Sequence, residues 1–344
     1  MLRDVRFARP AFGLLAVLCL TARAEQDKPD TSLDIYAKPG ELIDIGAGRK
    51  LNLRCSGSGT PAVILESGNN ADSMTWSKVQ PGVAKFARVC AYDRAGTGFS
   101  DGGPLPRTLD ANADDLYALI RAAHVSLPVV LVGHSYGTNV VRRVADRNAQ
   151  AVAALVLLDP PPQHVGEFAP EFDKLDAEDR AATLKVYRQC EAAAEKGELD
   201  VPSAQPAQCL RGPNPAYSAE LNAALHASKV RPAFWHTVIS ISENNGALYA
   251  QPVPKTETHG ALPLLILQPD APFADAPPEI GKPLEAARQK TQRAIAATST
   301  HGSIIPVANS SHDVQIDRPD AVIDAIGAAI KQVNTQPRRK DTSS

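Results

Sequence analysis

The chain has 344 residues, which is enough for one large α/β domain or two small ones. Apolar residues make up 44% of the chain and charged residues 22%, an ordinary balance for a globular protein. The formal net charge is −2, so no excess of positive charge points to nucleic acid as a partner.

The first 24 residues differ in composition from the rest of the chain. Arginines at 3, 6 and 9 precede an apolar run over 11–20, and Ala-Arg-Ala at 22–24 provides a small-x-small cleavage site. This order predicts a signal peptide over 1–24 and therefore export, to the periplasm or out of the cell. The apolar run is shorter than the about 20 residues of a membrane span, so we expect no stable span after cleavage. The alternative is an uncleaved N-terminal anchor.

Export changes the interpretation of the cysteines, because compartments outside the cytosol are oxidising. Cys19 would leave with the signal peptide, and the remaining four can form two disulfides in three ways. We pair Cys190 with Cys209, which are close in sequence, and Cys55 with Cys90. The alternative is buried free thiols. None of the four has His or Cys neighbours at zinc-ligand spacing, so we expect no metal site.

Short apolar runs alternate with helix-like segments along the mature chain. The strand candidates are 51–55, 62–65, 88–92, 129–132, 154–158, 264–267 and 304–308. Most are continuous apolar runs, as expected of strands that are buried on both faces. Apolar residues at helical spacing indicate helices over 109–124 and 320–333. The alternation predicts an α/β protein with a mostly parallel, doubly wound sheet.

This alternation is interrupted between the strand candidates 154–158 and 264–267. Three helix-like pieces lie there, at 177–196, 218–228 and 232–250, separated by joints rich in Pro and Gly. Such a helical insertion between two core strands predicts a cap over one edge of the sheet. The expected domains are a core formed by 25–160 and 261–334, a cap over 161–260 and a disordered tail over 335–344.

The sequence Gly-His-Ser-Tyr-Gly at 133–137 is the motif that indicates chemistry. A serine hydroxyl is a poor nucleophile until a base takes its proton and its oxygen is exposed. Gly-x-Ser-x-Gly between a strand and a helix exposes the serine at a turn where bulky neighbours would clash. The strand candidate 129–132 precedes the motif, and a helix-like stretch over 139–145 follows it. We therefore predict Ser135 as a nucleophile; the alternative is an ordinary Gly-rich turn.

A histidine and an acid must activate this serine. His312 fits as the base, because it follows the last strand candidate and precedes the last helix candidate; the alternative is an incidental loop histidine. Two aspartates compete as the acid. Asp159 ends the strand candidate that follows the motif, and Asp270 comes just after the next strand candidate. Both satisfy the chain order of serine, acid and histidine.

The oxyanion of a tetrahedral intermediate needs preorganised N–H donors. One expected donor is the backbone N–H of Tyr136, directly after the nucleophile. The other should come from the loop after the strand candidate 62–65, where Gly68 lets the backbone turn. We choose the N–H of Asn69 for this role, with Asn70 as the alternative.

At these residues the chain resembles the α/β-hydrolase superfamily over nearly all of its mature sequence. Residues 67–69, Ser-Gly-Asn, are similar to the family's His-Gly-x oxyanion loop, with Ser in place of His. Residues 93–100 resemble the family's Asp-x-x-Gly-x-Gly-x-Ser turn, which is usually structural. Residues 311–313, Ser-His-Asp, are similar to the loop of the catalytic histidine.

The resemblance also bears on the acid and on one disulfide. The family's usual acid lies a few residues beyond a glycine that ends the next-to-last strand, but 268–272 lacks that glycine and Asp270 falls early. Some relatives place the acid one strand sooner, where Asp159 lies, so the resemblance favours Asp159. The family's strand order would put the strands of Cys55 and Cys90 side by side.

The implied activity is hydrolysis of a carboxylic ester, lactone or activated amide through an acyl-Ser135 intermediate. The substrate would be a small molecule, and we expect no cofactor. Serine in place of aspartate at the nucleophile position argues against dehalogenase and epoxide-hydrolase chemistry. Two alternatives stay open: aminopeptidase, C–C hydrolase or perhydrolase chemistry with the same triad, and a non-catalytic binding protein on a hydrolase scaffold.

Overall fold

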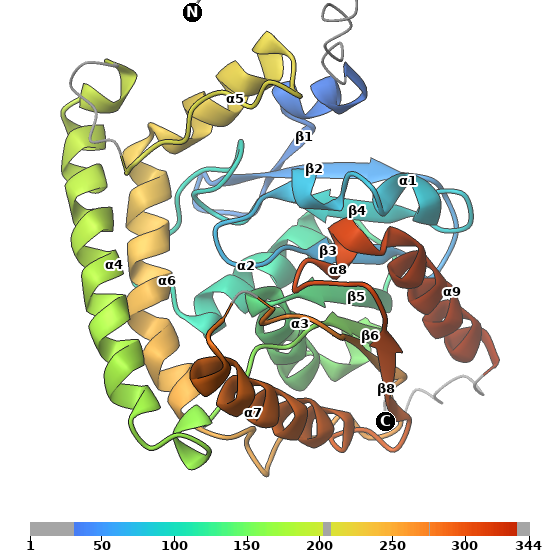
Figure 1. Ribbon diagram of the computed structural model, residues 1–344. Coiled ribbons are helices and arrows are strands. Elements are labelled where there is room, and N and C mark those ends of the chain that lie inside the picture. Colours follow the sequence, from blue (N-terminus) through green and yellow to red (C-terminus); the bar gives the residue numbers. More distant parts are fainter. Residues whose placement is uncertain (1–30, 202–207, 275, 336–344) are drawn as a thin grey trace, which may run out of the picture.

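The computed structural model describes residues 31–201, 208–274 and 276–335 (Figure 1). The predicted signal peptide over 1–24 lies outside these residues, and so does the predicted tail beyond Thr335. Within the described ranges, no helix combines the length and the apolar character needed to cross a bilayer.

In the described part of the chain, a sheet of eight strands forms the centre, in the order β1-β2-β4-β3-β5-β6-β7-β8. β2 runs antiparallel to both of its neighbours, and the other pairs are parallel. The strands are β1 Glu41–Asp44, β2 Lys50–Ser56, β3 Val63–Glu66, β4 Val89–Tyr92, β5 Val129–His134, β6 Val152–Leu158, β7 Leu264–Pro269 and β8 Gly302–Val307. The predicted mostly parallel sheet is confirmed. The short edge strand β1 is an addition that the sequence analysis did not predict.

Helices cover both faces of this sheet (Figure 1). The helices are α1 Gln80–Val83, α2 Leu109–Ala122, α3 Tyr136–Arg147, α4 Phe172–Glu195, α5 Ala219–Lys229, α6 Pro232–Ala250, α7 Pro278–Ala296, α8 Val314–Asp317 and α9 Pro319–Thr335. Short 3₁₀ helices lie at η1 Thr31–Ala37, η2 Ser73–Trp76, η3 Ala149–Ala151, η4 Val165–Glu167 and η5 Glu198–Asp200. α2 and α3 pack into one apolar cluster, and α1 and α9 pack into the cluster on the opposite face. Because helices pack on both faces of the sheet, the sheet is doubly wound, as predicted.

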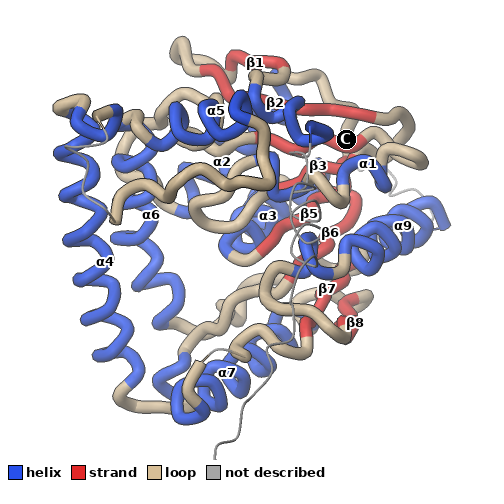
Figure 2. Tube along the Cα trace, turned by 45° about the horizontal axis from the view of Figure 1, so that its top comes forward, coloured by secondary structure: helices blue, strands red, loops and turns tan. Residues whose placement is uncertain are grey.

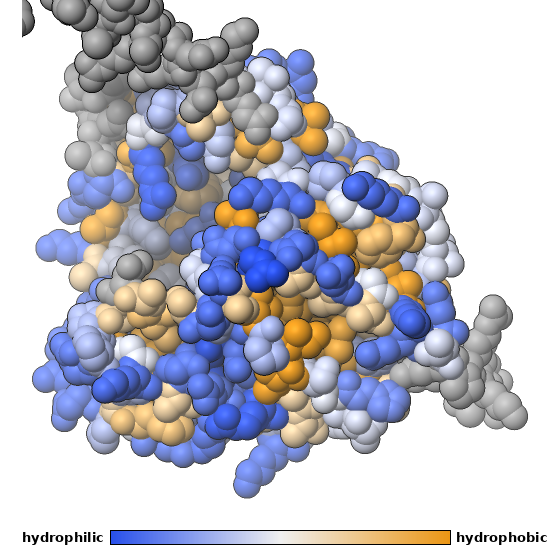
Figure 3. All heavy atoms as spheres, turned by 45° about the vertical axis from the view of Figure 1, so that its right-hand side comes forward, coloured by the Kyte–Doolittle hydropathy of each residue, from blue (hydrophilic) through white to orange (hydrophobic). Residues whose placement is uncertain are grey.

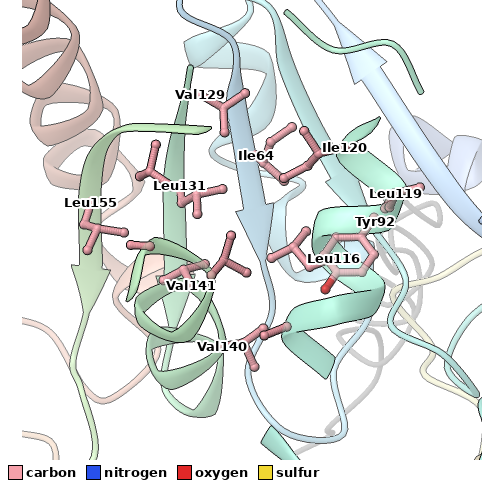
Figure 4. Packing of buried hydrophobic residues seen from close by; sticks show 14 of the residues in the cluster. Ile64, Tyr92, Leu116, Leu119, Ile120, Val129, Leu131, Val140, Val141 and Leu155 are labelled. Atoms are coloured by element: carbon pink, nitrogen blue, oxygen red, sulfur yellow. The ribbon is translucent and has the colours of Figure 1, made fainter. Parts of the chain in front are cut away.

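Strand β5 shows why the sheet is buried on both sides. Val129 and Leu131 pack into the cluster under α2 and α3, which Figure 4 shows together with Leu116 and Val140 of the same cluster. Val130 and Val132 of β5 belong to the cluster under α9. Because successive side chains of a strand point to opposite faces, a continuous apolar run suits a strand between two helical layers.

The segment between β6 and β7 carries α4, α5 and α6 beside the sheet, where the sequence predicts a cap (Figure 2). α4 and α6 pack side by side, and the start of α4 lies near the end of α6. A separate apolar cluster around Cys190, Phe234 and Trp235 stabilises this pair. α4 begins at Phe172, five residues before the predicted start of that helix.

Among the residues that the structure describes there are two disulfides, and both join the cysteines paired from the sequence. Cys55 and Cys90 are directly opposite each other on β2 and β4. Cys190 on α4 is joined to Cys209, which lies before α5 in the same helical segment.

Polar and charged side chains cover most of the face shown in Figure 3, with smaller apolar patches between them.

The parallel strands bring distant parts of the sequence to one edge of the sheet. The residues that directly follow β3, β5, β6 and β7 are Ser67, Ser135, Asp159 and Asp270. Ligands of open α/β sheets bind beyond the carboxyl ends of the strands, so this edge is the place to look for a functional site.

Candidate active site

Ser135 connects β5 to α3 in a backbone conformation that is rare for residues with a side chain. Its φ is 52° and its ψ is −124°. Gly133 and Gly137 make this turn possible. A Cβ on Gly133 would lie 2.6 Å from the carbonyl oxygen of Gly137, and a Cβ on Gly137 would lie 2.6 Å from that of Ser67. The four neighbours of Ser135 within the motif are buried, whereas Ser135 is partly exposed. The turn therefore leaves Ser135 accessible while the residues on either side of it are buried.

The predicted base and the favoured acid are hydrogen-bonded to each other. His312 Nδ1 lies 2.7 Å from Asp159 Oδ2. The Asp159 side chain is 2% exposed, whereas that of His312 is 40% exposed. The carboxylate is thus buried behind the imidazole, and the imidazole faces outward. This arrangement fits an acid that orients a base.

Asp270, the alternative acid, has other partners. Its carboxylate accepts the backbone N–H of Asn309 at 3.0 Å and that of Ser310 at 3.1 Å. These hydrogen bonds lower the pKa of Asp270, which is an exposed side chain. Asp270 therefore shapes the loop that leads to His312, while Asp159 contacts the imidazole itself.

Helix α7 supplies two further partners of Asp159. Arg288 Nη1 donates to Asp159 Oδ1 at 2.8 Å, and Gln292 Nε2 donates to the same oxygen at 2.9 Å. This helix is not among the helices predicted from the sequence, so neither residue is among the predicted site residues. The available signal was the helical spacing of Leu284, Ala287 and Ile295, which Pro283 inside the helix obscures.

The predicted oxyanion loop packs against the nucleophile. A Cβ on Gly68 would lie 3.3 Å from Ser135 Cβ and 3.0 Å from Nδ1 of His134, so a side chain here would require these neighbours to shift by a few tenths of an ångström. Asn69 follows at an exposed position. The Asn70 side chain donates to the hydroxyl of Tyr187 on α4 at 3.3 Å, which connects the loop to the cap.

Ser67 stands where the resemblance expects a histidine. Its hydroxyl accepts a hydrogen bond from Nε1 of Trp76 at 3.1 Å and donates one to the carbonyl oxygen of Asp72 at 2.8 Å. Trp76 is fully buried. The hydrogen bond between Ser67 and Trp76 therefore fixes the start of the predicted oxyanion loop.

His134 directly precedes the nucleophile in sequence, and its side chain contacts the predicted base. Its Nε2–H donates to the backbone oxygen of His312 at 3.0 Å, and the two rings are 4.8 Å apart between centroids. Burial, followed by the nearby His312, lowers the pKa of His134 to about 4. A neutral imidazole thus connects the serine turn to the histidine loop.

A cavity of about 380 Å³ lies between the loop after β6 and the helices α4 and α6. Pro161 and Pro162 on the loop after β6 form one wall, and the start of α4 and the end of α6 form the others, with Phe172 and Tyr249. Among the described residues, no group of three or more His, Cys, Asp and Glu side chains is arranged to hold a metal.

Comparisons with known proteins connect this geometry to a family. The family model described as "alpha/beta hydrolase fold" matches residues 61–185, which contain the serine turn and Asp159. The protein named "Uncharacterized protein YqjL" of Bacillus subtilis is 34% identical over 104 residues, which are 30% of this chain and 41% of that protein. N-formylmaleamate deformylase of Pseudomonas putida is 34% identical over 123 residues, which are 36% of this chain and 45% of the enzyme. The chain thus spans less than half the length of these curated relatives.

A solved structure of a thermophilic esterase from Thermogutta terrifontis is similar over almost the whole fold. It covers 87% of this chain and 100% of its own, with a TM-score of 0.57 and 20% identity. At this identity the likeness concerns the fold. Together with the family match over residues 61–185 and the order of the sheet, it shows that the chain has the α/β-hydrolase fold.

Proposed function

We propose that this protein is an exported serine hydrolase that cleaves a carboxylic ester, lactone or activated amide. The single observation that carries the proposal is the 2.7 Å hydrogen bond between His312 and the buried Asp159, beside the sharp turn that exposes Ser135. A nucleophile, a base and an orienting acid on three separate loops are the parts that acyl transfer requires.

In the proposed reaction, Nε2 of His312 takes the proton of the Ser135 hydroxyl as its oxygen attacks the substrate carbonyl. Asp159 holds the imidazole by Nδ1 and stabilises its cation. The backbone N–H groups of Asn69 and Tyr136 bind the negative oxygen of the tetrahedral intermediate. The imidazolium then returns the proton to the leaving alcohol or amine, and the carbonyl stays attached to Ser135.

Water completes the cycle. His312 removes a proton from a water molecule, whose oxygen attacks the acyl carbon, and the same two N–H groups bind the second oxyanion. The intermediate collapses to the carboxylic acid, and the proton on His312 returns to the Ser135 oxygen. The enzyme is regenerated, and one water has been added across the cleaved bond.

The environment of Asp159 supports its role as the acid. One carboxylate oxygen faces His312, and the other binds Arg288 and Gln292. Because these donors fix the carboxylate plane, Oδ2 stays directed at the imidazole. Second-layer hydrogen bonds of this kind hold catalytic groups at productive geometry.

The substrate class rests on the cavity under the cap and on the relatives. The cavity is lined by apolar residues together with the charged Asp173, Asp176 and Arg180, which fits a small-molecule substrate that carries both a carbon chain and polar groups. One relative is named a deformylase and a structural neighbour an esterase, and both names describe hydrolysis at a carbonyl. We extend that chemistry to this chain as part of the proposal.

The test is a hydrolysis screen with short- and long-chain nitrophenyl esters, lactones and aminoacyl anilides. We expect turnover of at least one class by the wild type and none above background by Ser135→Ala. Ser126→Ala, at an exposed position outside the site, should keep wild-type rates and serves as the control. Equal rates in the wild type and Ser135→Ala would refute the proposal.

Export has its own test. The two disulfides are compatible with an oxidising compartment, and residues 1–24 have the pattern of a signal peptide. The full chain should be found outside the cytosol with an N-terminus at Glu25. An intact N-terminus on membrane-bound protein would favour the anchor instead.

A further inference from the structure

The proposed oxyanion hole is built on one buried cation, Arg94. Its side chain is 2% exposed and lies next to Glu66, whose side chain is 1% exposed. Arg94 Nη2 donates to the carbonyl oxygen of Ser67 at 2.6 Å, and Nη1 donates to that of Gly68 at 3.3 Å. The same guanidinium lies 5.2 Å from the ring centroid of Tyr136. One side chain therefore contacts both segments that would supply the oxyanion donors.

The two carbonyl contacts determine where the neighbouring N–H groups point. In a trans peptide the C=O and the following N–H are directed to opposite sides of the chain. Since the Gly68 carbonyl points to Arg94, the N–H of Asn69 points away from it. Gly68 packs against Ser135 on the side of its missing Cβ. Arg94 thus fixes the orientation of the peptide that carries the proposed donor.

Tyr136 is held at both ends of its side chain. Its ring lies against the Arg94 guanidinium, and its hydroxyl accepts a hydrogen bond from Asn112 Nδ2 at 2.9 Å. A cation over an aromatic ring is attractive, especially where water is excluded. The backbone N–H of Tyr136 begins α3, so fixing this side chain also limits the movement of the second donor.

Glu66 balances the buried charge. It ends β3 directly before the oxyanion loop, and its carboxylate accepts from Arg94 Nε at 3.0 Å and from the hydroxyl of Tyr92. Burial would favour the neutral form of an arginine, but Glu66 raises the pKa of Arg94. A buried ion pair adds little stability over apolar residues of the same volume. Stability alone therefore does not explain why the Arg94–Glu66 ion pair is buried at this position.

We propose that Arg94, held by Glu66, is a positioning residue that sets the N–H groups of Asn69 and Tyr136 for the oxyanion. The inference rests on the proposed function of Ser135. Asp93-Arg94 was interpreted from the sequence only as part of a structural turn. The contacts assign Arg94 to the catalytic geometry, although it does not itself touch the reacting atoms.

The test compares Arg94→Lys with Arg142→Lys. Lysine keeps the charge but cannot present the planar fork that contacts Glu66 and two carbonyls together. Arg142 is a matched control, since it is a buried arginine on α3 paired with Glu257 at 2.8 and 2.6 Å. Both variants should lose thermal stability. Only Arg94→Lys should lower kcat, by roughly 10- to 100-fold with KM changed less than threefold, because misplaced donors weaken the transition state.

A second readout separates positioning from a general loss of structure. Affinity for a boronic acid, whose adduct with the serine is a tetrahedral anion, should fall in Arg94→Lys by the same factor as kcat. If Arg94→Lys does not fold, the double variant Glu66→Leu with Arg94→Met removes both charges, keeps the volume and should show the same loss. Equal kcat and boronate affinity in the Arg94 and Arg142 variants would overturn the inference alone. Absence of Ser135-dependent hydrolysis in the wild type would overturn the proposed function as well.

Discussion

Arg288 on α7 donates from Nη1 to Oδ1 of Asp159 at 2.8 Å, and its Nη2 donates to the backbone oxygen of Pro269 at 3.1 Å. The guanidinium therefore ties the end of β6, where Asp159 lies, to the end of β7. Asp159 itself binds β7 through its N–H, which donates to the Leu267 oxygen at 3.0 Å. These contacts hold the carboxylate at the place where His312 meets it.

The two aspartates considered for the triad should differ sharply in their effect on activity. Asp159→Asn keeps the size of the side chain but removes the charge that orients and stabilises the His312 imidazolium, so we expect kcat to fall by roughly 10⁴-fold. Asp270→Asn should cost less than tenfold, because Asp270 binds only loop backbone. Steady-state kinetics with a nitrophenyl ester measure both. The reverse ranking would transfer the role of the acid to Asp270.

Removing the Arg288 guanidinium should leave the buried Asp159 carboxylate without its cationic partner. We expect Arg288→Met to lower the free energy of unfolding by about 3 kcal/mol, the range found when one partner of a buried ion pair is removed. Glu285→Gln is the control, since Glu285 is the more exposed partner of the same arginine. Urea unfolding monitored by circular dichroism provides the comparison. Equal stability of the two variants would argue against a buried charge pair at Asp159.

Stability should fall as the pH falls from about 6.5 to about 4, because His134 is held neutral in the folded state. Its pKa is lowered from 6.5 to about 4, so in this window the unfolded chain binds a proton that the folded chain does not. Each pKa unit corresponds to about 1.4 kcal/mol, which gives a total of about 3 kcal/mol. His134→Gln should flatten this part of the pH profile of unfolding. The exposed His124→Asn should leave it unchanged.

The cap should depend on its own disulfide. Cys190 and Cys209 are 19 residues apart, and closing a loop of that size stabilises a fold by about 3 kcal/mol. Replacing both with alanine should lower the melting temperature of the protein and increase amide hydrogen exchange in α4 and α6. Replacing only one cysteine should give a similar loss. An unchanged melting temperature would mean that the cap is held by the packing of Trp235 and its neighbours alone.

The parts of the site with local sequence signals could be predicted from the sequence. The turn around Ser135 has an apolar strand before it, two glycines at which a Cβ would clash with neighbouring backbone, and a helix after it. His312 lies in the loop after the last strand, as the order of elements indicates. Each of these features depends on residues that are neighbours in the chain.

The remaining parts depend on tertiary packing. Asp159 and Asp270 each follow a core strand; the family resemblance favours Asp159, and the contact with His312 in space supports that choice. Arg288 and Gln292 come from α7, whose pattern is interrupted by Pro283. The strand β1 was missed because only Ile43 of its four residues is buried, so it lacks an apolar run.

The central claim is that Ser135 is an activated nucleophile. The most direct measurement is intact-protein mass spectrometry after incubation with a fluorophosphonate, followed by peptide mapping. We expect one phosphonyl group per chain, on the peptide that contains Ser135. We also expect no adduct in Ser135→Ala and much slower labelling in His312→Ala. An unlabelled wild type, or an adduct of equal yield in Ser135→Ala, would contradict this claim.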